Sequence, residues 1–431
     1  MRQDSSDLAA EREQMDLTRS RLTPEEADEL LAEAVLTDEG RQDPYPTYRA
    51  LREGIGRWRS STGSMILTSY GDGLEVLRNP RLGRPEPDME RPLTIARRSQ
   101  REFGEVQSML MLNPPDHTRI RSLVSRAFTP GRVAALRPNI VSTLEPVLDR
   151  FREQGGGDLI ENVASVFPIA VISEMLGVPH SLAPQVQPLV RAITALIDSA
   201  ATDDDVAAGE EAVGELSVIF DELIGHKRSS PDDGLLSALF EVEESGDRLS
   251  HEELIANTIL LYSAGFETTG NLIGNGMLLL LSNPDQMHAL RKDPTLIPSA
   301  IMEMLRADSP VQLNVRTALE PVEIFGETHD RGATFVVLQG SGNHDGAVYA
   351  DAEEFDVSRF VSPDTATPLS FGWGAHHCLG AHLARAEGEI FFSRMLQTSV
   401  TIELNGDSSL APRFRSSFTL RGLDNLEIAI S

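Results

Sequence analysis

The 431-residue chain contains one cysteine, Cys378, so it cannot form a disulfide within itself. The sequence therefore gives no sign of an oxidising compartment. A single cysteine also excludes an iron–sulfur cluster held by four thiolates, and it excludes the common structural zinc sites with paired cysteines.

Long hydrophobic runs are missing as well. The longest unbroken apolar run, Met277 to Leu281, is far shorter than the roughly 20 residues that a membrane-spanning helix needs. The first residues, MRQDSSDLAAEREQMD, lack the apolar core of a signal peptide. We therefore expect a cytoplasmic protein that does not span a membrane.

Basic residues are scarce. The chain has 38 lysines and arginines against 66 aspartates and glutamates, a formal net charge of -28. Nucleic-acid binding and docking on anionic membranes both depend on basic surfaces, so we expect neither kind of partner. Aromatic residues make up only 5%, but 40% hydrophobic and 24% charged residues are ordinary values for a globular enzyme.

The remaining patterns predict a mainly α-helical protein with smaller β-sheets, an α+β fold. Helical periodicity dominates residues 105 to about 305, and β-branched residues and turn signals become frequent after Arg306. RWRSSTGSMILTSY predicts an early hairpin that turns at Thr62-Gly63. The segments SVTIELNG and NLEIAIS predict final strands.

We expect two regions along the chain. Residues 1–40 are charged and rich in Ala and Glu, which predicts a partly flexible N-terminal arm with a short helix in TPEEADELLAEAV. Residues 41–431 show no repeat and no low-complexity linker, which predicts a single domain.

A long central helix is predicted to begin with a capping box, Ser250 with Glu253. Its middle reads AGFET and places Glu267 and Thr268 in an otherwise apolar stretch. Two interpretations are open. The helix is either a kinked core helix with one charge facing water, which the residues alone favour, or it opens beside a ligand, with Glu267 and Thr268 handling protons.

Cys378 lies in FGWGAHHCLG, just before another predicted helix. A nucleophilic pair with His376 or His377 is one interpretation, in a cysteine- or zinc-dependent hydrolase. The flanking glycines favour another, in which the backbone approaches a large flat group. Backbone N–H groups and a helix N-terminus would stabilise a thiolate there, as ligation of haem iron through sulfur requires.

Taken together, the motifs resemble those of the cytochrome P450 monooxygenases. FGWGAHHCLG matches every fixed position of the haem-binding loop of that family. Five more segments match in the expected order over residues 43 to about 425: DPYPTYRALR, NPPDHTRIR, AGFET, EMLR and FDVSR.

The resemblance implies the cytochrome P450 fold, with haem b between the long central helix and the cysteine loop. Cys378 would be the axial ligand of the iron, with Phe371 beside the sulfur. The other implied haem contacts are Gly372 and Gly380 under the porphyrin, Ala264 on the central helix, and His117, Arg121, Arg316 and His376 at the propionates. Glu267 and Thr268 would guide protons to the oxygen being activated.

The resemblance also implies a buried network of Glu303, Arg306 and Arg359 behind the haem. Many bacterial members have Asn-Arg-Asp where this chain has Asn343-His344-Asp345, and we expect that change to affect a surface contact only.

The implied function is a monooxygenase that hydroxylates or epoxidises a small hydrophobic organic substrate, with secondary-metabolite biosynthesis as the favoured setting. It would use O2 and electrons from NAD(P)H through ferredoxin reductase and ferredoxin. The family topology implies a pocket lined by residues 84–104, 185–205, 260–264, 311–315 and 417–418. A haem-binding protein of the same fold without turnover is an alternative, and the hydrolase is another.

Overall fold

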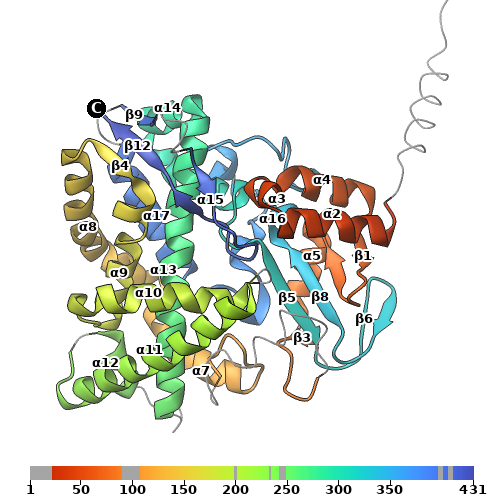
Figure 1. The fold of residues 1–431 in the computed structure, drawn as a ribbon, viewed down its shortest axis with the longest axis horizontal. Coiled ribbons are helices and arrows are strands. Elements are labelled where there is room, and N and C mark those ends of the chain that lie inside the picture. The colour runs from red at the N-terminus through yellow and green to blue at the C-terminus, as the bar shows by residue number, and fades with distance from the viewer. Residues whose placement is uncertain are drawn as a thin grey trace, which may run out of the picture.

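The computed structural model describes residues 22–89, 107–198, 201–232, 234–241, 249–396, 401–405 and 411–431. Within them the chain is mainly helical with small sheets, as predicted. Most of the helices gather around α13 to one side of the main sheet, whereas the first helices of the chain lie beside the sheet (Figure 1). The α-helices are α2 (Pro24–Leu36), α3 (Asp38–Gln42), α4 (Tyr45–Gly54), α5 (Tyr70–Arg78), α7 (Asp116–Ser125), α8 (Pro130–Glu153), α9 (Phe167–Leu176), α10 (Ala183–Thr194), α11 (Asp203–Ser229), α12 (Leu235–Glu241), α13 (His251–Ser282), α14 (Pro284–Lys292), α15 (Ile297–Ala307), α16 (Gln339–Gly342) and α17 (Ala381–Leu396).

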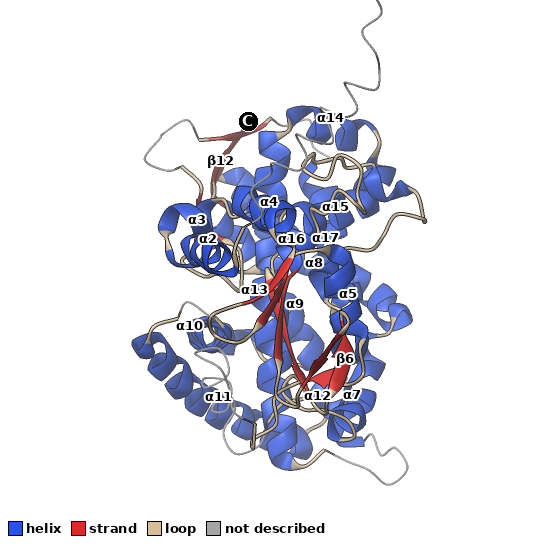
Figure 2. Ribbon diagram, turned by 90° about the vertical axis from the view of Figure 1, so that its right-hand side faces the viewer, coloured by secondary structure: helices blue, strands red, loops and turns tan. Residues whose placement is uncertain are grey.

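The largest sheet joins strands from residues 57–83 to strands from residues 313–338, with strand order β1-β2-β8-β5-β3. Strands β2 and β8 pair in parallel although Met65 and its partner Phe335 are far apart in the chain. Figure 2 shows the strands as a narrow band in a helical molecule. The strands are β1 (Arg57–Arg59), β2 (Met65–Leu67), β3 (Leu82–Gly83), β4 (Gly156–Asp158), β5 (Leu313–Ala318), β6 (Val322–Ile324), β7 (Glu327–His329), β8 (Thr334–Leu338), β9 (Ile402–Leu404), β10 (Arg413–Phe414), β11 (Leu423–Asn425) and β12 (Glu427–Ile430).

Several local predictions are confirmed. Strands β1 and β2 form the predicted antiparallel hairpin, and β9 pairs with β12 near the end of the chain. Helix α2 is the helix predicted in the arm, and its Ala27 is fully buried. The Trp58 indole N–H donates to Asp28 of α2 over 2.8 Å. Residues 22–40 are therefore packed onto the protein body, and residues 1–21 lie outside the described residues.

Helix α13 runs unbroken through the helical body. Its predicted capping box is present, with Ser250 Oγ accepting from the Glu253 N–H over 3.1 Å and the Ser250 N–H donating to Glu253 Oε2 over 2.8 Å. The helix ends at Ser282, and Pro284 begins α14. The Thr268 hydroxyl donates to the Ala264 carbonyl one turn earlier, over 2.8 Å, so it does not interrupt the helix.

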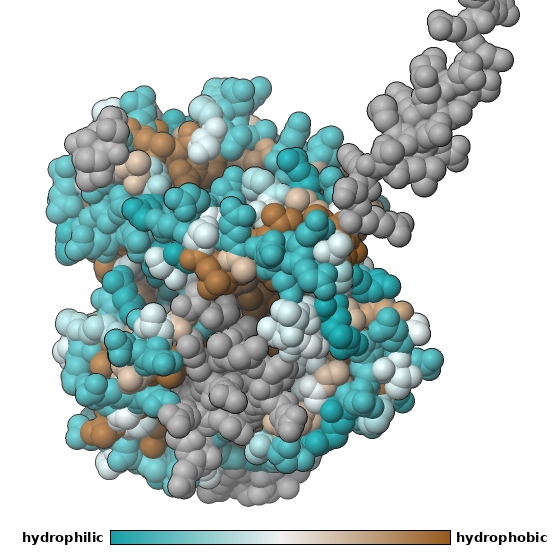
Figure 3. All heavy atoms as spheres, turned by 45° about the vertical axis from the view of Figure 1, so that its right-hand side comes forward, coloured by the Kyte–Doolittle hydropathy of each residue, from teal (hydrophilic) through white to brown (hydrophobic). Residues whose placement is uncertain are grey.

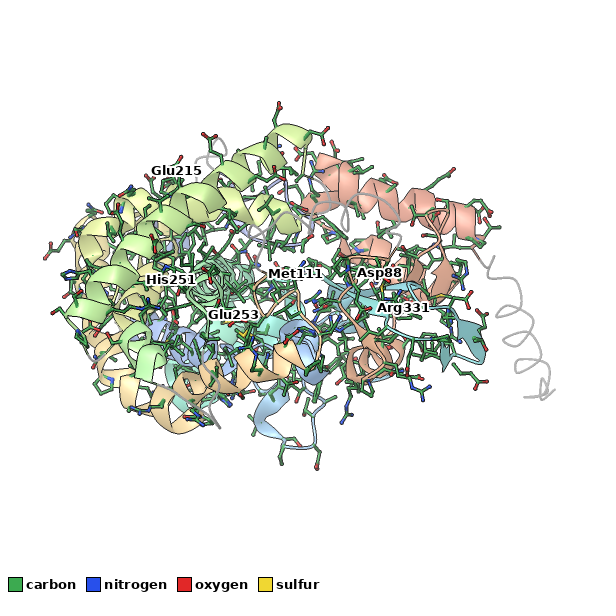
Figure 4. All side chains as sticks on the ribbon, turned by 90° about the horizontal axis from the view of Figure 1, so that it is seen from below. Asp88, Met111, Glu215, His251, Glu253 and Arg331 are labelled. Atoms are coloured by element: carbon green, nitrogen blue, oxygen red, sulfur yellow. The ribbon has the colours of Figure 1, made fainter. Side chains whose placement is uncertain are left out.

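Ion pairs fix the N-terminal end of α13 against its neighbours. Both guanidinium ends of Arg119, from α7, donate to the Glu253 carboxylate. His251 Nε2 lies 2.5 Å from Asp221 Oδ1 of α11. Figure 4 shows Glu253 and His251 on the same end of α13. The contact between Arg119 and Glu253 fixes α7 relative to α13.

Figure 4 also shows Asp88 beside Arg331 at the other side of the molecule, where the two side chains are 2.9 Å apart.

A buried ion-pair network of Glu303, Arg306 and Arg359 is present, as the family resemblance implies. Arg306 donates to both oxygens of Glu303, over 2.7 and 2.8 Å, and both side chains are fully buried. Arg359 Nε donates to the same carboxylate over 3.1 Å. Arg306 also donates to the Asn343 carbonyl over 3.0 Å. The network thus joins α15 to the loop after α16.

Asn343 connects this network to the segment that precedes the cysteine loop. Its side-chain oxygen accepts from the Leu369 N–H over 2.8 Å, and its side-chain nitrogen donates to Ser370 Oγ over 2.9 Å. The Ser370 hydroxyl returns to α15 by donating to the Leu305 carbonyl over 2.6 Å. The start of the FGWGAHHCLG loop is therefore fixed to α15.

The expectation of a surface contact at His344 is wrong. His344 is 6% exposed and stacks on Tyr45 with ring centroids 4.5 Å apart. Its Nε2 lies 3.0 Å from the Ala307 carbonyl and its Nδ1 lies 3.2 Å from a Glu353 carboxylate oxygen. An imidazole, shorter than an arginine, fits this enclosed position between α4 and α15.

Hydrophilic residues cover most of the face in Figure 3, and apolar atoms reach that surface in small separate patches. None of the helices in the described part of the chain combines the length and the hydrophobicity needed to cross a bilayer.

Removing the shared acid of the buried network tests its importance. We expect Glu303→Gln to lower the free energy of unfolding by about 3–5 kcal/mol, because Arg306 and Arg359 lose the anion that compensates their burial. Chemical denaturation monitored by circular dichroism measures the change.

The exposed pair of Arg81 and Glu320, 3.0 Å apart, supplies the control. Glu320→Gln should change the free energy of unfolding by less than about 1 kcal/mol. Equal effects of the two substitutions would contradict the role given to the buried network.

Candidate functional site

Cys378 sits between a short 3-10 helix, η8 (Gly374–His376), and the start of α17. The loop is held from two sides. The Cys378 N–H donates to the Phe371 carbonyl over 2.8 Å, and Arg121 of α7 donates to the His377 carbonyl over 2.6 Å. The Phe371 side chain packs against the helical core. The thiol is thereby fixed in place with its sulfur accessible.

Two glycines set the path of this loop. Gly372 has φ +62° and Gly374 has φ +74°, a region that L side chains rarely adopt. A Cβ on Gly374 would also lie 2.4 Å from the Leu77 carbonyl oxygen. At Gly380 a Cβ would meet nothing within 4 Å. The backbone after the thiol therefore borders open space, as approach of a large flat group requires.

The surroundings of Cys378 act on its thiol in opposite directions. Cys378 is an exposed residue, but protein atoms surround its thiol, so desolvation by burial raises the pKa of Cys378. The Gly380 N–H, which hydrogen-bonds the sulfur, and the positive charge of Arg121 both lower that pKa. Both groups would stabilise a thiolate once a metal ion replaces the proton.

Four predicted cofactor-binding residues meet near this loop. His117 and Arg121 lie on α7, Arg316 on β5 and His376 on η8. The rings of His117 and His376 are 4.3 Å apart. Burial, followed by the charges of Arg84 and Arg316, strongly lowers the pKa of His376. The structure therefore brings the four together as a cluster of basic groups that repel one another.

The cluster contains polar atoms that still need partners. Arg316 is 1% exposed, and its Nη2 has no hydrogen-bond partner among the described residues; the same is true of His117 Nδ1. No carboxylate in the described ranges forms an ion pair with either side chain. A buried cationic site of this kind calls for an anion.

Arg84 belongs to the same cluster; from the sequence it was expected in the pocket lining and not among the cofactor contacts. Its charge acts on His117, Arg316 and His376. Asn113 holds its backbone, accepting from the Arg84 N–H and donating to its carbonyl, both over 2.8 Å. Asn113 begins the NPPDHTRIR motif. This asparagine was the one available sign of Arg84 in the sequence, and its partner lies 29 positions earlier in the chain.

Ala264 and Thr268 lie on one face of α13, four residues apart. Ala264 is exposed and Thr268 partly exposed, although the helix around them is largely buried. Helix α13 also packs against α17, which follows Cys378. This pair therefore borders accessible space in the interior of the molecule.

Glu267, next to Thr268 in the chain, is buried. It is 7% exposed, and its Oε1 accepts a hydrogen bond from Arg415 over 2.7 Å. The structure therefore places Glu267 beside a basic partner from the segment between β10 and β11.

Three of the predicted pocket segments converge. The Gln312 N–H donates to the Thr419 carbonyl over 3.0 Å, and Val311 bridges to Leu420. Asp198 Oδ1 accepts from the Phe418 N–H over 3.3 Å. Of the predicted lining, residues 90–104 and 199–200 lie outside the described residues.

These residues fit haem b. The accessible thiol suits one axial position of the iron, the open space beside Gly380 suits a porphyrin face, and the buried cations with unpartnered nitrogens suit the two propionate carboxylates. Among the described residues, no group of three or more His, Cys, Asp and Glu side chains is arranged to hold a metal ion.

Comparison with known proteins agrees with this fit. Residues 209–404 match the family model for Cytochrome P450. Cytochrome P450 107B1 of Saccharopolyspora erythraea is 38% identical over 416 residues, which cover 94% of this chain and 99% of that protein. Vitamin D(3) 25-hydroxylase of Pseudonocardia autotrophica is 37% identical over 395 residues, covering 90% of this chain and 94% of the other.

The crystal structure of P450BioI in complex with hexadec-9Z-enoic acid ligated acyl carrier protein matches with a TM-score of 0.83. The match has 31% identity and covers 91% of this chain and 99% of that one. The fold, the motifs and the sequence similarity over nearly the full length of the chain agree, and together they exclude the hydrolase interpretation. The chain belongs to the cytochrome P450 family, whose members are oxidoreductases that bind haem b.

Proposed function

We propose that the protein hydroxylates or epoxidises a small hydrophobic organic molecule, with electrons that come from NAD(P)H through ferredoxin reductase and ferredoxin. The observation that carries the proposal is the accessible Cys378 sulfur next to a buried cationic cluster. When bound, haem b with a thiolate ligand supplies the activation of O2, by which one oxygen atom enters the substrate and the other leaves as water.

The residues of this chain have distinct roles in that proposal. Cys378 would bind the haem iron through its sulfur, and Phe371, which packs against the helical core, would shield that sulfur. His117, Arg121, Arg316 and His376 hold the propionates, together with Arg84. Gly372 and Gly380 let the loop pass close to the porphyrin, and Ala264 borders its other face.

Thr268 is the residue best placed to hold a proton at the open side of α13. Its hydroxyl donates to the Ala264 carbonyl over 2.8 Å, so its oxygen keeps lone pairs that can accept a hydrogen bond from a water or a substrate group. Glu267 lies one residue earlier and is the nearest acid in the chain. We assign the delivery of protons to this pair.

A hydrophobic substrate is supported by the names of the relatives. One relative is named as a hydroxylase of vitamin D(3), and one matched structure holds a fatty acyl carrier protein. In this chain, Leu260 and Phe418 are buried apolar residues of the predicted pocket segments. We favour a precursor of a secondary metabolite.

The one cysteine of this chain cannot hold a four-cysteine iron–sulfur cluster. We propose ferredoxin as the donor, a cytoplasmic setting, and a single P450 domain over residues 41–431 preceded by an N-terminal arm.

Reconstitution with ferredoxin, its reductase and NAD(P)H tests the function. We expect a ligand that shifts the spin state of the haem spectrum to be oxygenated by the wild type. Thr268→Ala should bind haem and that ligand equally well but divert most of the consumed electrons to hydrogen peroxide, because the proton carrier is gone. Product, NAD(P)H and peroxide are measured together.

Thr269→Ala, one residue further along the same helix, is the matched control and should keep the wild-type ratio of product to NAD(P)H. Wild-type protein that binds haem but oxygenates none of its spin-shifting ligands would favour the alternative without turnover. Equal coupling in Thr268→Ala and wild type would remove Thr268 from proton delivery.

The proposed propionate site also predicts a pH effect. Burial, followed by the charge of Arg121, lowers the pKa of His117 to about 4. An ordinary histidine titrates near 6.5, so between these values the unfolded chain binds more protons and the folded haem-free protein loses stability as the pH falls. Relative to His117→Asn, haem-free wild type should lose up to about 1.4 kcal/mol of unfolding free energy per pH unit.

Denaturant titrations between pH 4 and 7 measure this difference, with the exposed His180→Asn variant as the control. Bound haem should reduce the pH effect, because propionates favour the charged form of His117. A difference between wild type and His117→Asn that does not change with pH would contradict the assignment.

A further inference from the structure

Asp198 joins two predicted pocket segments that lie 220 positions apart in the chain. It follows the short 3-10 helix η4 (Ala195–Ile197), in the connection between α10 and α11. Its Oδ1 accepts hydrogen bonds from the backbone N–H groups of Phe418 and Thr419, over 3.3 and 3.4 Å. One carboxylate oxygen therefore holds two successive amides of the turn between β10 and β11.

This contact is enclosed by protein. Asp198 and Thr419 are each 7% exposed, and Phe418 is 5% exposed. A buried carboxylate is costly to desolvate unless donors surround it, and a buried N–H group without an acceptor is costly as well. The hydrogen bonds between Asp198 and the turn meet both requirements at once. Removal of the carboxylate would leave two buried amides without this acceptor.

The turn is also fixed on its opposite side. The Gln312 N–H donates to the Thr419 carbonyl over 3.0 Å. The Phe418 side chain packs in the apolar cluster that includes Leu313 of β5. These contacts hold the turn to the main sheet, and Asp198 adds a link from the turn to the helical body.

The connection that carries Asp198 is itself packed onto α11. Leu196 is 2% exposed, and a Cβ on Gly209 of α11 would lie 2.8 Å from the Leu196 side chain. The Asp198 N–H donates to the Ala195 carbonyl over 3.2 Å. The carboxylate therefore has a fixed position relative to α11, and its bonds to the turn determine how close the turn lies to the helices α10 and α11.

We propose that Asp198 is a positioning residue of the substrate pocket, which sets the width of the pocket by holding the Phe418 and Thr419 backbone against the connection between α10 and α11. The inference rests on the proposed oxygenation of a hydrophobic substrate and adds a residue that determines which sizes of substrate are held in one orientation. Without the carboxylate, the turn and the connection separate, and a bulky ligand loses contact with the turn.

Hydrogen exchange of the holoenzyme, followed by mass spectrometry, tests the contact itself. We expect the peptide that contains Phe418 and Thr419 to exchange about tenfold faster in Asp198→Ala than in the wild type, because both amides lose their acceptor. Asp198→Asn keeps a side-chain oxygen and should recover most of the protection. Asp204→Asn removes the same charge from an exposed position on α11 and should exchange like the wild type. Equal exchange in Asp198→Ala and wild type would overturn the inference.

Two haem ligands of different size separate positioning from general damage to the fold. Clotrimazole is bulky and needs the walls of a hydrophobic pocket, whereas imidazole is small. We expect Asp198→Ala to bind clotrimazole about tenfold more weakly, because the turn no longer packs against it, and to bind imidazole with unchanged Kd. The haem absorption spectrum measures both. Equal losses for the two ligands would show a purely structural role, and unchanged binding of clotrimazole would equally overturn the positioning role.

A spin-shifting substrate gives a result that depends on the proposed function. We expect Asp198→Ala to raise KM about tenfold with little change in kcat, and to form more than one oxygenated product where the wild type forms one. Asp198→Asn should restore the wild-type product.

The outcomes distinguish this inference from the function on which it rests. If the wild type oxygenates no ligand, the proposed function fails, while hydrogen exchange and clotrimazole binding still decide the position of the turn. If the wild type oxygenates its substrate and Asp198→Ala matches it in exchange, binding and products, the positioning role is wrong and the proposed function stands.

Discussion

The structure depends on the charge balance of one fully buried carboxylate, that of Glu303. It accepts hydrogen bonds from Arg306 and Arg359, and Arg306 also donates to the carbonyl of Asn343. Asn343 in turn fixes the backbone of Leu369, two residues before the cysteine loop. A pair buried so deeply costs much to desolvate, and its benefit is geometric, because it joins a helix, a loop and the approach to Cys378 into one unit.

The candidate site, unlike the Glu303 network, has an excess of basic groups. Basic groups from α7, β5 and the cysteine loop are buried together, and burial lowers the pKa of both His117 and His376. Folding brings these groups into a low-dielectric space without a described carboxylate to balance them. Such a cluster is costly to bury alone and suits an anionic group, so binding of the haem propionates there would stabilise the folded protein.

The sequence was sufficient where the chemistry is local. The capping box of Ser250 and Glu253 and the hairpin of β1 and β2 act over a few residues, and both were predicted correctly. Contacts between distant segments were not accessible: the pairing of Asn113 with Arg84 and of Arg415 with Glu267, 148 positions apart, arises only from the fold. His344 was misplaced at the surface because a histidine in a polar segment shows no sign of burial.

The central claim is that Cys378 binds haem iron through its sulfur. The absorption spectrum of the reduced protein under carbon monoxide tests it most directly, measured on the wild type and on Cys378→Ser. The account predicts a Soret band at the position typical of a thiolate ligand in the wild type, and loss of that band in the variant. A wild-type band at the position typical of an imidazole ligand, or a thiolate-type band that persists in Cys378→Ser, would contradict it.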